Sequence, residues 1–515
     1  MAPGKVLVRP FITKLYCTAI GREPHRTSGL GFAAATNRRQ GNWQMGSGWL
    51  ATNPMKKISL LALAASAALS SPLLAQAKPE ETAALRDAAL TDSVAWDITE
   101  GLTTEIGPRL AGSDAEARAR DWAVARLKAL GFSNVRVEPF EVPYWERGEA
   151  SAEIVAPYPQ PLVLTALGNS AATPAKGLTA EVIGFDSLDS LKAADPAAVK
   201  GKTVFLTHRM AVTQDGSHYG TVGKVRREGP SVASKLGAAA ILIRSIGTDH
   251  HRAPHTGAQS WSDGAQPIPA LALANPDADQ LERVLKRGQP VTVALKATAR
   301  MAGKRLSGNV IAEVPGRDPN AGIVLVGGHL DSWDQGTGAI DDAAGVAITT
   351  AAAKRIMDAG QPLRTIRVVW FGSEEIGLFG GAAYREKHKD EKHHLLAESD
   401  FGSDRIWRYQ TSIAEAALPA MKPLAAALAP LGIQPAPRNG DASGSDISEI
   451  QKLGIPVIEL GQDGTRYFDV HHTPDDTLDK VDPAQLRQNV AAWTALLSVT
   501  ANDPTDYGPV PPRAH

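Results

Sequence analysis

Short apolar runs alternate with longer helical patterns in the C-terminal part of the chain. The runs cover residues 323–326, 366–371 and 456–460, and an Ala-rich helical segment over 343–359 follows the first of them. The first run, IVLV, is entirely apolar, as expected of a strand that is buried on both faces of a parallel sheet. The alternation predicts an α/β fold with a mixed, mainly parallel sheet covered by helices.

Two regions with other sequence patterns precede this part. Residues 80–132 have a helical pattern interrupted at GPRLAGS, residues 107–113, after which Ser113 and Glu116 are spaced as a capping box. From about residue 156 to residue 300, short Val/Ile/Leu runs are separated by Gly, Pro and Asp turns, which predicts a separate β-rich module with a few helices. The Pro-rich stretch after Asn502 is typical of a loose tail.

The N-terminal region has the pattern of a secretory signal. Met55, Lys56 and Lys57 precede an apolar stretch that ends in an Ala-Gln-Ala site at residues 75–77, so the mature chain is expected to begin at Lys78. The alternative is an uncleaved membrane anchor, which the helix breaker Pro72 and the small residues near the site disfavour. Residues 1–54 are then a leader or a non-native extension from a start codon assigned too early.

Charge and cysteine content limit the binding partners and the metal-binding side chains that the protein can have. The chain has 515 residues, 43% hydrophobic and 21% charged, which is ordinary for a globular protein of at least two domains. The residues after Lys57 carry a net charge of −9, which argues against nucleic-acid binding. The single cysteine, Cys17, lies in the leader, so a metal in the mature chain must bind His and carboxylate side chains.

The segment GGHLDSWDQGTGAIDDAAG, residues 327–345, follows the first predicted strand. It places His329, Asp331 and Asp341 between that strand and the Ala-rich helix. Ligands of open α/β sheets bind at the carboxyl ends of the strands, and imidazole with carboxylate suits a zinc-like divalent cation. The segment therefore predicts a metal site.

Three further clusters follow predicted strands or lie in loops near them. They are Glu374–Glu375, Asp400 in ESD, and His472 in HHTPDDT. Each one alone is more often an exposed acidic pair, a turn aspartate or a solvated loop. Together they supply two histidines and several carboxylates at one edge of the predicted sheet.

The ordered set of these motifs resembles the M28-type zinc-dependent exopeptidase family, and within it the carboxypeptidase Q (plasma glutamate carboxypeptidase) subgroup. The resemblance covers nearly the whole mature chain. It implies a three-layer αβα fold with an inserted protease-associated (PA) domain. The expected division is a helical N-terminal part of the peptidase domain over 78–150, the PA domain over 151–303, the catalytic domain over 304–505 and a loose tail over 506–515.

The resemblance also implies a ligand set for two Zn²⁺ ions. Asp341 would bridge the two ions, His329 and Asp400 would complete one site, and Glu375 and His472 the other. His472 is preferred to His471 because it is followed by Thr473, Asp476 and Thr477 in the family's spacing. The peptide bond between Asp341 and Asp342 would be cis.

Two residues are expected to act without binding metal. Asp331 resembles the aspartate that bonds the free nitrogen of a ligand imidazole and fixes its tautomer. Glu374 would be the general base that takes a proton from a water molecule and passes it to the leaving amine. Paired zinc ions lower the pKa of a shared water towards ~7, which makes such a proton transfer possible at neutral pH.

The expected function is hydrolysis of small unmodified peptides, especially dipeptides, by a periplasmic or secreted homodimer. Loop NGDASGSDISE, residues 439–449, and module loop HHRAPHTG, residues 250–257, resemble the carboxypeptidase Q subgroup, although loop histidines commonly have no metal role. Arg466 and Tyr467 are candidates to contact a substrate carboxylate or oxyanion. Two alternatives remain open at this stage: a receptor-like binding protein of the same fold, and a single-zinc glutaminyl cyclase.

Overall fold

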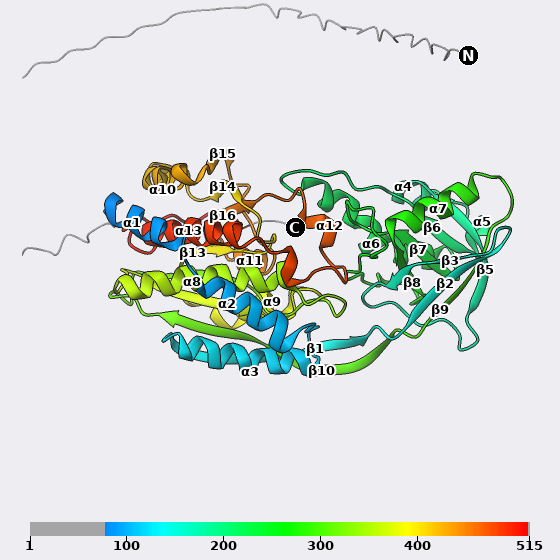
Figure 1. Ribbon diagram of the computed structural model, residues 1–515, viewed down its shortest axis with the longest axis horizontal. Helices are drawn as coiled ribbons and strands as arrows, with labels where there is room; N and C mark the ends of the chain where they lie inside the picture. Colours follow the sequence, from blue (N-terminus) through cyan, green and yellow to red (C-terminus); the bar gives the residue numbers. More distant parts are fainter. Residues whose placement is uncertain (1–77, 513–515) are drawn as a thin grey trace, which may run out of the picture. The chain divides into compact units, whose positions relative to one another are not determined.

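The computed structural model describes residues 78–512, and within them the chain forms two eight-stranded sheets with helices (Figure 1). The predicted signal at 55–77 and the leader at 1–54 lie outside the described residues. None of the helices in the part described is long and apolar enough to span a membrane.

The first sheet has a parallel centre flanked by antiparallel strands. Strands β12, β11, β13 and β16 run parallel to one another, whereas β1, β10 and β14 pair antiparallel to their neighbours towards the centre. Across the sheet the order is β1 (Ser133–Glu146), β10 (Arg300–Val314), β12 (Thr365–Phe371), β11 (Ile323–His329), β13 (His393–Glu398), β16 (Val457–Gln462), β14 (Ile406–Ser412) and β15 (Gln434–Asn439). The predicted mixed sheet is confirmed, and the carboxyl ends of its parallel strands β12, β11, β13 and β16 lie at one edge.

Alternating side chains of the central strands belong to two separate cores. Val324 and Val326 pack in the larger cluster and Leu325 packs in the smaller one, as expected for a strand covered on both faces. On the larger side lie α1 (Pro79–Ala89), α2 (Val94–Gly101), α3 (Asp114–Ala129), α8 (Ala344–Ala359), α10 (Lys422–Leu428) and α13 (Pro483–Thr500), and on the smaller side α9 (Phe379–His388) and α11 (Ile447–Gln451). The first sheet therefore forms the middle of three layers.

The second sheet is built from the segment between β1 and β10. Its order is β3 (Gln160–Leu162), β2 (Ala150–Ala156), β9 (Thr292–Ala297), β5 (Leu178–Phe185), β6 (Thr203–Leu206), β7 (Ala240–Arg244), β8 (Ala270–Leu273) and β4 (Leu164–Ala166). Its helices are α4 (Leu188–Lys192), α5 (Pro196–Val199), α6 (Ser217–Lys235) and α7 (Asn275–Leu285). The predicted strands at 203–206 and 240–243 are β6 and β7.

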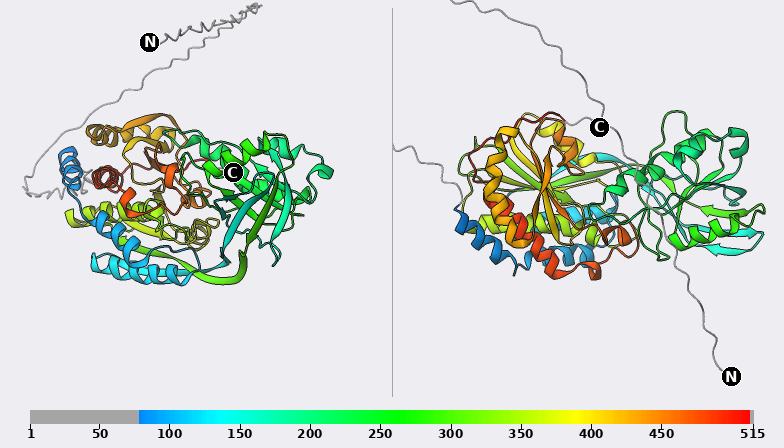
Figure 2. Two further views of the ribbon diagram at one scale, coloured as in Figure 1. Left: turned by 45° about the vertical axis from the view of Figure 1, so that its right-hand side comes forward. Right: turned by 90° about the horizontal axis from the view of Figure 1, so that it is seen from above.

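Strands β1 and β10 lead into and out of this segment side by side. They pair antiparallel from Ser133 with Glu313 to Glu146 with Arg300, and Figure 2 shows the ribbon of β10 curving along its length. Because both crossings between the two sheets are paired with each other, the segment with the second sheet is joined to the first sheet by a two-stranded ribbon.

Two local predictions were wrong. Ser113 accepts a hydrogen bond from the Glu116 amide at 3.0 Å, but the Glu116 carboxylate does not return to Ser113; it accepts from the Gly112 amide at 3.3 Å and from Ser307 Oγ at 3.1 Å. Half of the capping box therefore forms, because Arg120 and the buried Ser307 both bind the Glu116 carboxylate. The stretch after Asn502 also packs: Tyr507 is fully buried and its hydroxyl donates to Asp503 at 2.9 Å.

Candidate metal centre

The ends of three parallel strands bring the predicted side chains together. His329 is the last residue of β11 and pairs in register with Phe371 at the end of β12, three residues before Glu374. On the other side of β11, Gly327 pairs with Glu398, so Asp400 emerges at the same edge. Parallel pairing alone thus places three of the sequence motifs beside one another.

Glycines allow the start of α8 to approach these strand ends closely. A Cβ on Gly328 would clash with the Asp342 carboxylate, and a Cβ on Gly345 would clash with the carbonyl of Ser399 after β13. The absence of both side chains lets the turn between β11 and α8 carry Asp341 over the end of the sheet. The peptide bond between Asp341 and Asp342 is cis, as the resemblance implied.

Asp341 lies at the centre of two groups of ligand atoms. On one side its Oδ1 is 3.0 Å from His329 Nε2, which in turn lies 3.4 Å from Asp400 Oδ1. On the other side its Oδ2 is 3.2 Å from His472 Nε2, and that nitrogen lies 3.0 Å from Glu375 Oε2. The five residues expected as ligands therefore form two groups that share one carboxylate.

His471 also faces this centre. Its ring stacks on His472 with 3.5 Å between centroids, and its Nε2 lies 3.4 Å from Asp341 Oδ2. Of this pair, His472 contacts Glu375. The structure therefore brings both histidines to Asp341, whereas the sequence analysis selected one of them.

The donor set fits a divalent cation. Asp341 Oδ2 and Glu375 Oε1 are buried and have no hydrogen-bond partner among the described residues. Burial and the nearby Asp341 raise the pKa of Glu375 well above its usual range. Burial acts in the same direction on Asp341, but the neighbouring His329 and His472 hold its pKa well below its usual value. Several buried carboxylates this close repel each other unless a cation lies between them.

Asp331 holds the turn that carries the two glutamates. Its carboxylate accepts the amide of Glu374 at 3.0 Å and that of Glu375 at 3.3 Å. The Nδ1 of His329 lies 2.9 Å from the main-chain carbonyl of Asp331 and 3.7 Å from its carboxylate. The expected imidazole contact is therefore made through the backbone, because two amide donors already use the side chain.

Glu374 lies beside the two groups without being part of either. Burial, followed by the charge of Asp400, raises the pKa of its carboxyl group well above its usual range. A carboxylate with a raised pKa is suited to accept a proton and to release it again near neutral pH.

Three buried charged residues support the site and were not identified from the sequence. Asp342 accepts the amide of His329 at 3.0 Å, and Asp476 accepts the amides of Ala339 and Ile340 at 2.8 Å each. Arg109, in the loop GPRLAGS, donates to the carbonyls of Leu330, Thr337 and Gly338. In the sequence, the position of Arg109 within a Gly/Pro loop could have indicated a supporting role. The place of Asp476 in the HHTPDDT motif could have indicated the same for that residue.

A loop of the second-sheet segment lies against the histidine pair. His255 is 1% exposed; its Nδ1 lies 2.7 Å from the His471 carbonyl and its Nε2 lies 2.8 Å from Asp249 Oδ1. The amide of Thr256 donates to the His472 carbonyl at 3.0 Å. In HHRAPHTG, the loop that the sequence analysis singled out, His255 thus supports the histidine backbone and is in neither ligand group.

The two candidate substrate contacts have protein partners. Arg466 donates to Asp404 at 2.9 Å, and Tyr467 begins the short helix α12 (Tyr467–Val470) with its ring 4.7 Å from that of Phe401. Both line a cavity of about 270 Å³ next to Ile340, the residue before Asp341.

Comparisons with known proteins agree with this fold. Residues 309–497 match the model of peptidase family M28. Carboxypeptidase Q of Bos taurus is 36% identical over 404 residues, 78% of this chain and 84% of that protein, and the Homo sapiens protein is 35% identical over the same shares. The crystal structure of a peptidase M28 precursor from Shewanella amazonensis matches with a TM-score of 0.82 at 46% identity, covering 84% of this chain and 99% of that one.

The chain belongs to peptidase family M28, and it is a metallopeptidase. Its relatives over most of the chain are carboxypeptidase Q proteins, which agrees with the subgroup that the motifs indicate.

Proposed function

We propose that the protein is a secreted or periplasmic di-zinc exopeptidase that hydrolyses small peptides, with a carboxypeptidase Q-like dipeptidase or aminopeptidase activity. The observation that carries the proposal is the sharing of Asp341 between the His329–Asp400 group and the Glu375–His472 group, at contacts of 3.0–3.4 Å. Bound zinc would act as a Lewis acid on the scissile carbonyl and would lower the pKa of water towards ~7.

The residues of the chain then have separate tasks. Asp341 would hold both metals, with the other four ligands completing the two sites. Glu374 would accept the proton of the attacking water and deliver it to the amine that leaves. Asp331 would fix the position of Glu374 by binding its amide. Buried groups around the centre exclude competing water, which strengthens these electrostatic interactions.

The second-sheet segment has a proposed identity as well. We infer that residues 151–303 form an inserted PA domain between the helical part at 78–150 and the catalytic part at 304–505. The paired strands β1 and β10 and a separate eight-stranded sheet support an inserted unit. We further propose that the enzyme acts as a homodimer on peptide substrates.

The test is a substrate panel on the purified protein with and without zinc. We expect hydrolysis of unmodified dipeptides, its loss after chelation and its recovery on adding zinc. Blocking the amino or the carboxyl terminus in parallel peptides shows which end is required. A protein that binds peptides but hydrolyses none would be the receptor-like alternative, and cyclisation of an N-terminal glutamine peptide would indicate the cyclase.

A further inference from the structure

A cavity of about 280 Å³ lies beside the candidate metal centre. Asp400 forms part of its wall, together with Ser445, whose hydroxyl donates to Asp400 Oδ2. The opposite strands β16 and β14 add Gly461 and Arg408. Because Asp400 Oδ1 lies 3.4 Å from His329 Nε2, a molecule in this cavity would also reach the metal centre.

Arg408 lines this wall with a side chain that is 22% exposed, and its guanidinium lies 4.9 Å from the Trp407 ring centroid. Its Nε is buried with no hydrogen-bond partner among residues 78–512. The carboxylate oxygen Asp215 Oδ2 is 3.9 Å from Nη1, within ion-pair range but too far for a direct hydrogen bond. A buried guanidinium donor without an acceptor is costly unless an anion binds to it.

The strand pairing holds this guanidinium group against the cavity. Arg408 is opposite Gly461 in the antiparallel pair of β14 and β16. A Cβ on Gly461 would lie 3.1 Å from Arg408 Cγ and 3.2 Å from its Nε. The bare glycine backbone thus provides the space in which the arginine side chain lies flat.

The remaining charged groups of the cavity are acidic. They are Asp215, Glu398, Asp400 and Glu459, and Arg408 is the one cation among the described residues that line it. Asp400 belongs to the candidate metal centre, Glu398 accepts the amides of Asp446 and Ile447 at 3.3 and 3.2 Å, and Glu459 accepts the amide of Ser443 at 3.1 Å. Three of the four acids thus have other interactions, while the Nε of Arg408 has no hydrogen-bond partner among the described residues.

We propose that Arg408 binds a carboxylate of the peptide substrate and makes this cavity a specificity subsite. The proposal rests on the peptidase function proposed above and names the substrate class: peptides with a carboxylate on the residue beside the scissile bond. That carboxylate is either the free C-terminus or an acidic side chain, since a guanidinium fork binds both in the same way.

The test compares four substrates on zinc-loaded protein: Ala-Ala, Ala-Ala-amide, Ala-Glu-amide and Ala-Gln-amide. The variants are Arg408→Gln, Arg408→Lys and, as a control, Arg438→Gln, because Arg438 is an exposed arginine on the neighbouring strand β15 with an 80% exposed side chain. We expect Arg408→Gln to lower kcat/KM for Ala-Ala by at least about 10-fold and to leave Ala-Ala-amide unchanged, as one charge-assisted pair is lost. Arg408→Lys should recover part of the loss.

Each result supports or overturns the proposal. If the selective loss falls on Ala-Glu-amide and spares Ala-Gln-amide, the bound group is the side-chain carboxylate. Equal effects on all four substrates, or no effect, overturn the subsite. If the unmodified protein hydrolyses none of them, the proposed peptidase function fails instead, and calorimetry decides the subsite. The unmodified protein should bind alanine more tightly than alaninamide. The Arg408→Gln variant should bind the two compounds with equal affinity.

Discussion

Asp331 and Glu374 differ in how they serve the site. Asp331 is fully buried and uses its carboxylate on the backbone of the glutamate turn, whereas we propose that Glu374 uses its carboxylate in the chemistry. Neither role can be assigned from residue type, since both are acids beside a predicted metal. The amide contacts of Asp331 distinguish them, and the two substitutions below separate their effects.

Replacing Glu374 with Gln should reduce peptide turnover by at least about 100-fold while zinc content stays unchanged. Gln keeps the size of the side chain but cannot take a proton from water. Zinc content is measured by atomic absorption beside the steady-state assay. Glu386→Gln, on the exposed side of α9, is the matched control and should keep full activity. Near-normal turnover in Glu374→Gln would rule out its role as the base.

Replacing Asp331 with Ala should lower the free energy of unfolding by about 1–3 kcal/mol, because the amides of Glu374 and Glu375 lose their acceptor in a buried place. His329 should still bind zinc, since its Nδ1 contact is to the backbone carbonyl. Urea unfolding tests the loss of stability, and zinc stoichiometry tests whether zinc is retained. Loss of one zinc without loss of stability would mean that the carboxylate acts on the imidazole, as the sequence first suggested.

At the scale of elements, the parallel centre of the first sheet does most of the positioning. Strands β11, β12 and β13 end at one edge, and the segment after each one supplies a part of the candidate centre. Segment 323–326 and helix 343–359 were predicted within a few residues, because long apolar patterns reflect burial directly. The capping box at Ser113 was only half right, since the Glu116 carboxylate pairs with Arg120 and also accepts from Ser307, which is far away in sequence.

The same sheet contains a histidine that links stability to pH. His394 in β13 is buried beside Tyr507, and burial, with Arg364 and Lys392 nearby, lowers its pKa to about 3. The unfolded chain takes up a proton below about pH 6.5, while the folded protein does not. Stability is therefore full above pH 6.5 and falls as the pH is lowered towards 3.

Replacing His394 with Phe should flatten this dependence. Between pH 6.5 and pH 5.5, the unmodified protein should lose about 1 kcal/mol more unfolding free energy than the variant. Urea unfolding at the two pH values measures the difference. His250→Phe, at an exposed loop position, is the control and should keep the slope of the unmodified protein. Equal slopes for all three proteins would contradict a neutral buried His394.

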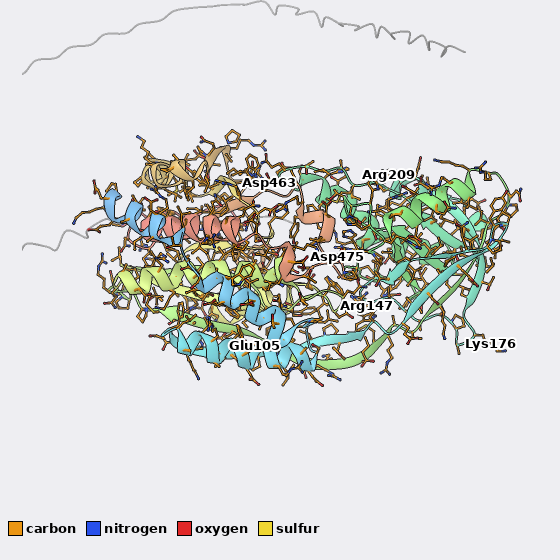
Figure 3. The ribbon with its side chains drawn as sticks, viewed as in Figure 1. Glu105, Arg147, Lys176, Arg209, Asp463 and Asp475 are labelled. Atoms are coloured by element: carbon orange, nitrogen blue, oxygen red, sulfur yellow. The ribbon has the colours of Figure 1, made fainter. Side chains whose placement is uncertain are left out.

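At the scale of the molecule, a loop of the second-sheet segment lies against the candidate centre. Arg147, labelled in Figure 3, follows β1 and donates to Asp334 at 2.9 Å, to Thr165 at 3.0 Å and to Thr256 at 2.9 Å. Its guanidinium lies 5.0 Å from the Trp145 ring centroid. Because Thr256 also bonds the His472 backbone, this arginine connects the second-sheet segment to the predicted metal ligand.

Replacing Arg147 with Ala should lower the free energy of unfolding by about 2 kcal/mol, as several charge-assisted hydrogen bonds are lost. It should also lower kcat/KM for dipeptides, since the loop that supports His472 loosens. Unfolding curves, limited proteolysis and the peptidase assay test both effects. Arg300→Ala on the paired strand β10 is the control, because that arginine is exposed and its side chain bonds Glu146. Equal proteolysis of both variants would contradict the connecting role.

The sequence by itself determined the class of fold, the family and the residues that gather at the strand ends. Burial patterns and short motifs depend on the type and spacing of residues that are close together in the sequence. The sequence could not determine which oxygen of Asp331 meets His329, that His471 also faces Asp341, or that Arg109, Thr256 and Arg408 lie around the centre. Those arrangements join residues up to hundreds of positions apart. They depend on strand register and on competition among buried hydrogen-bonding groups, which only the tertiary structure decides.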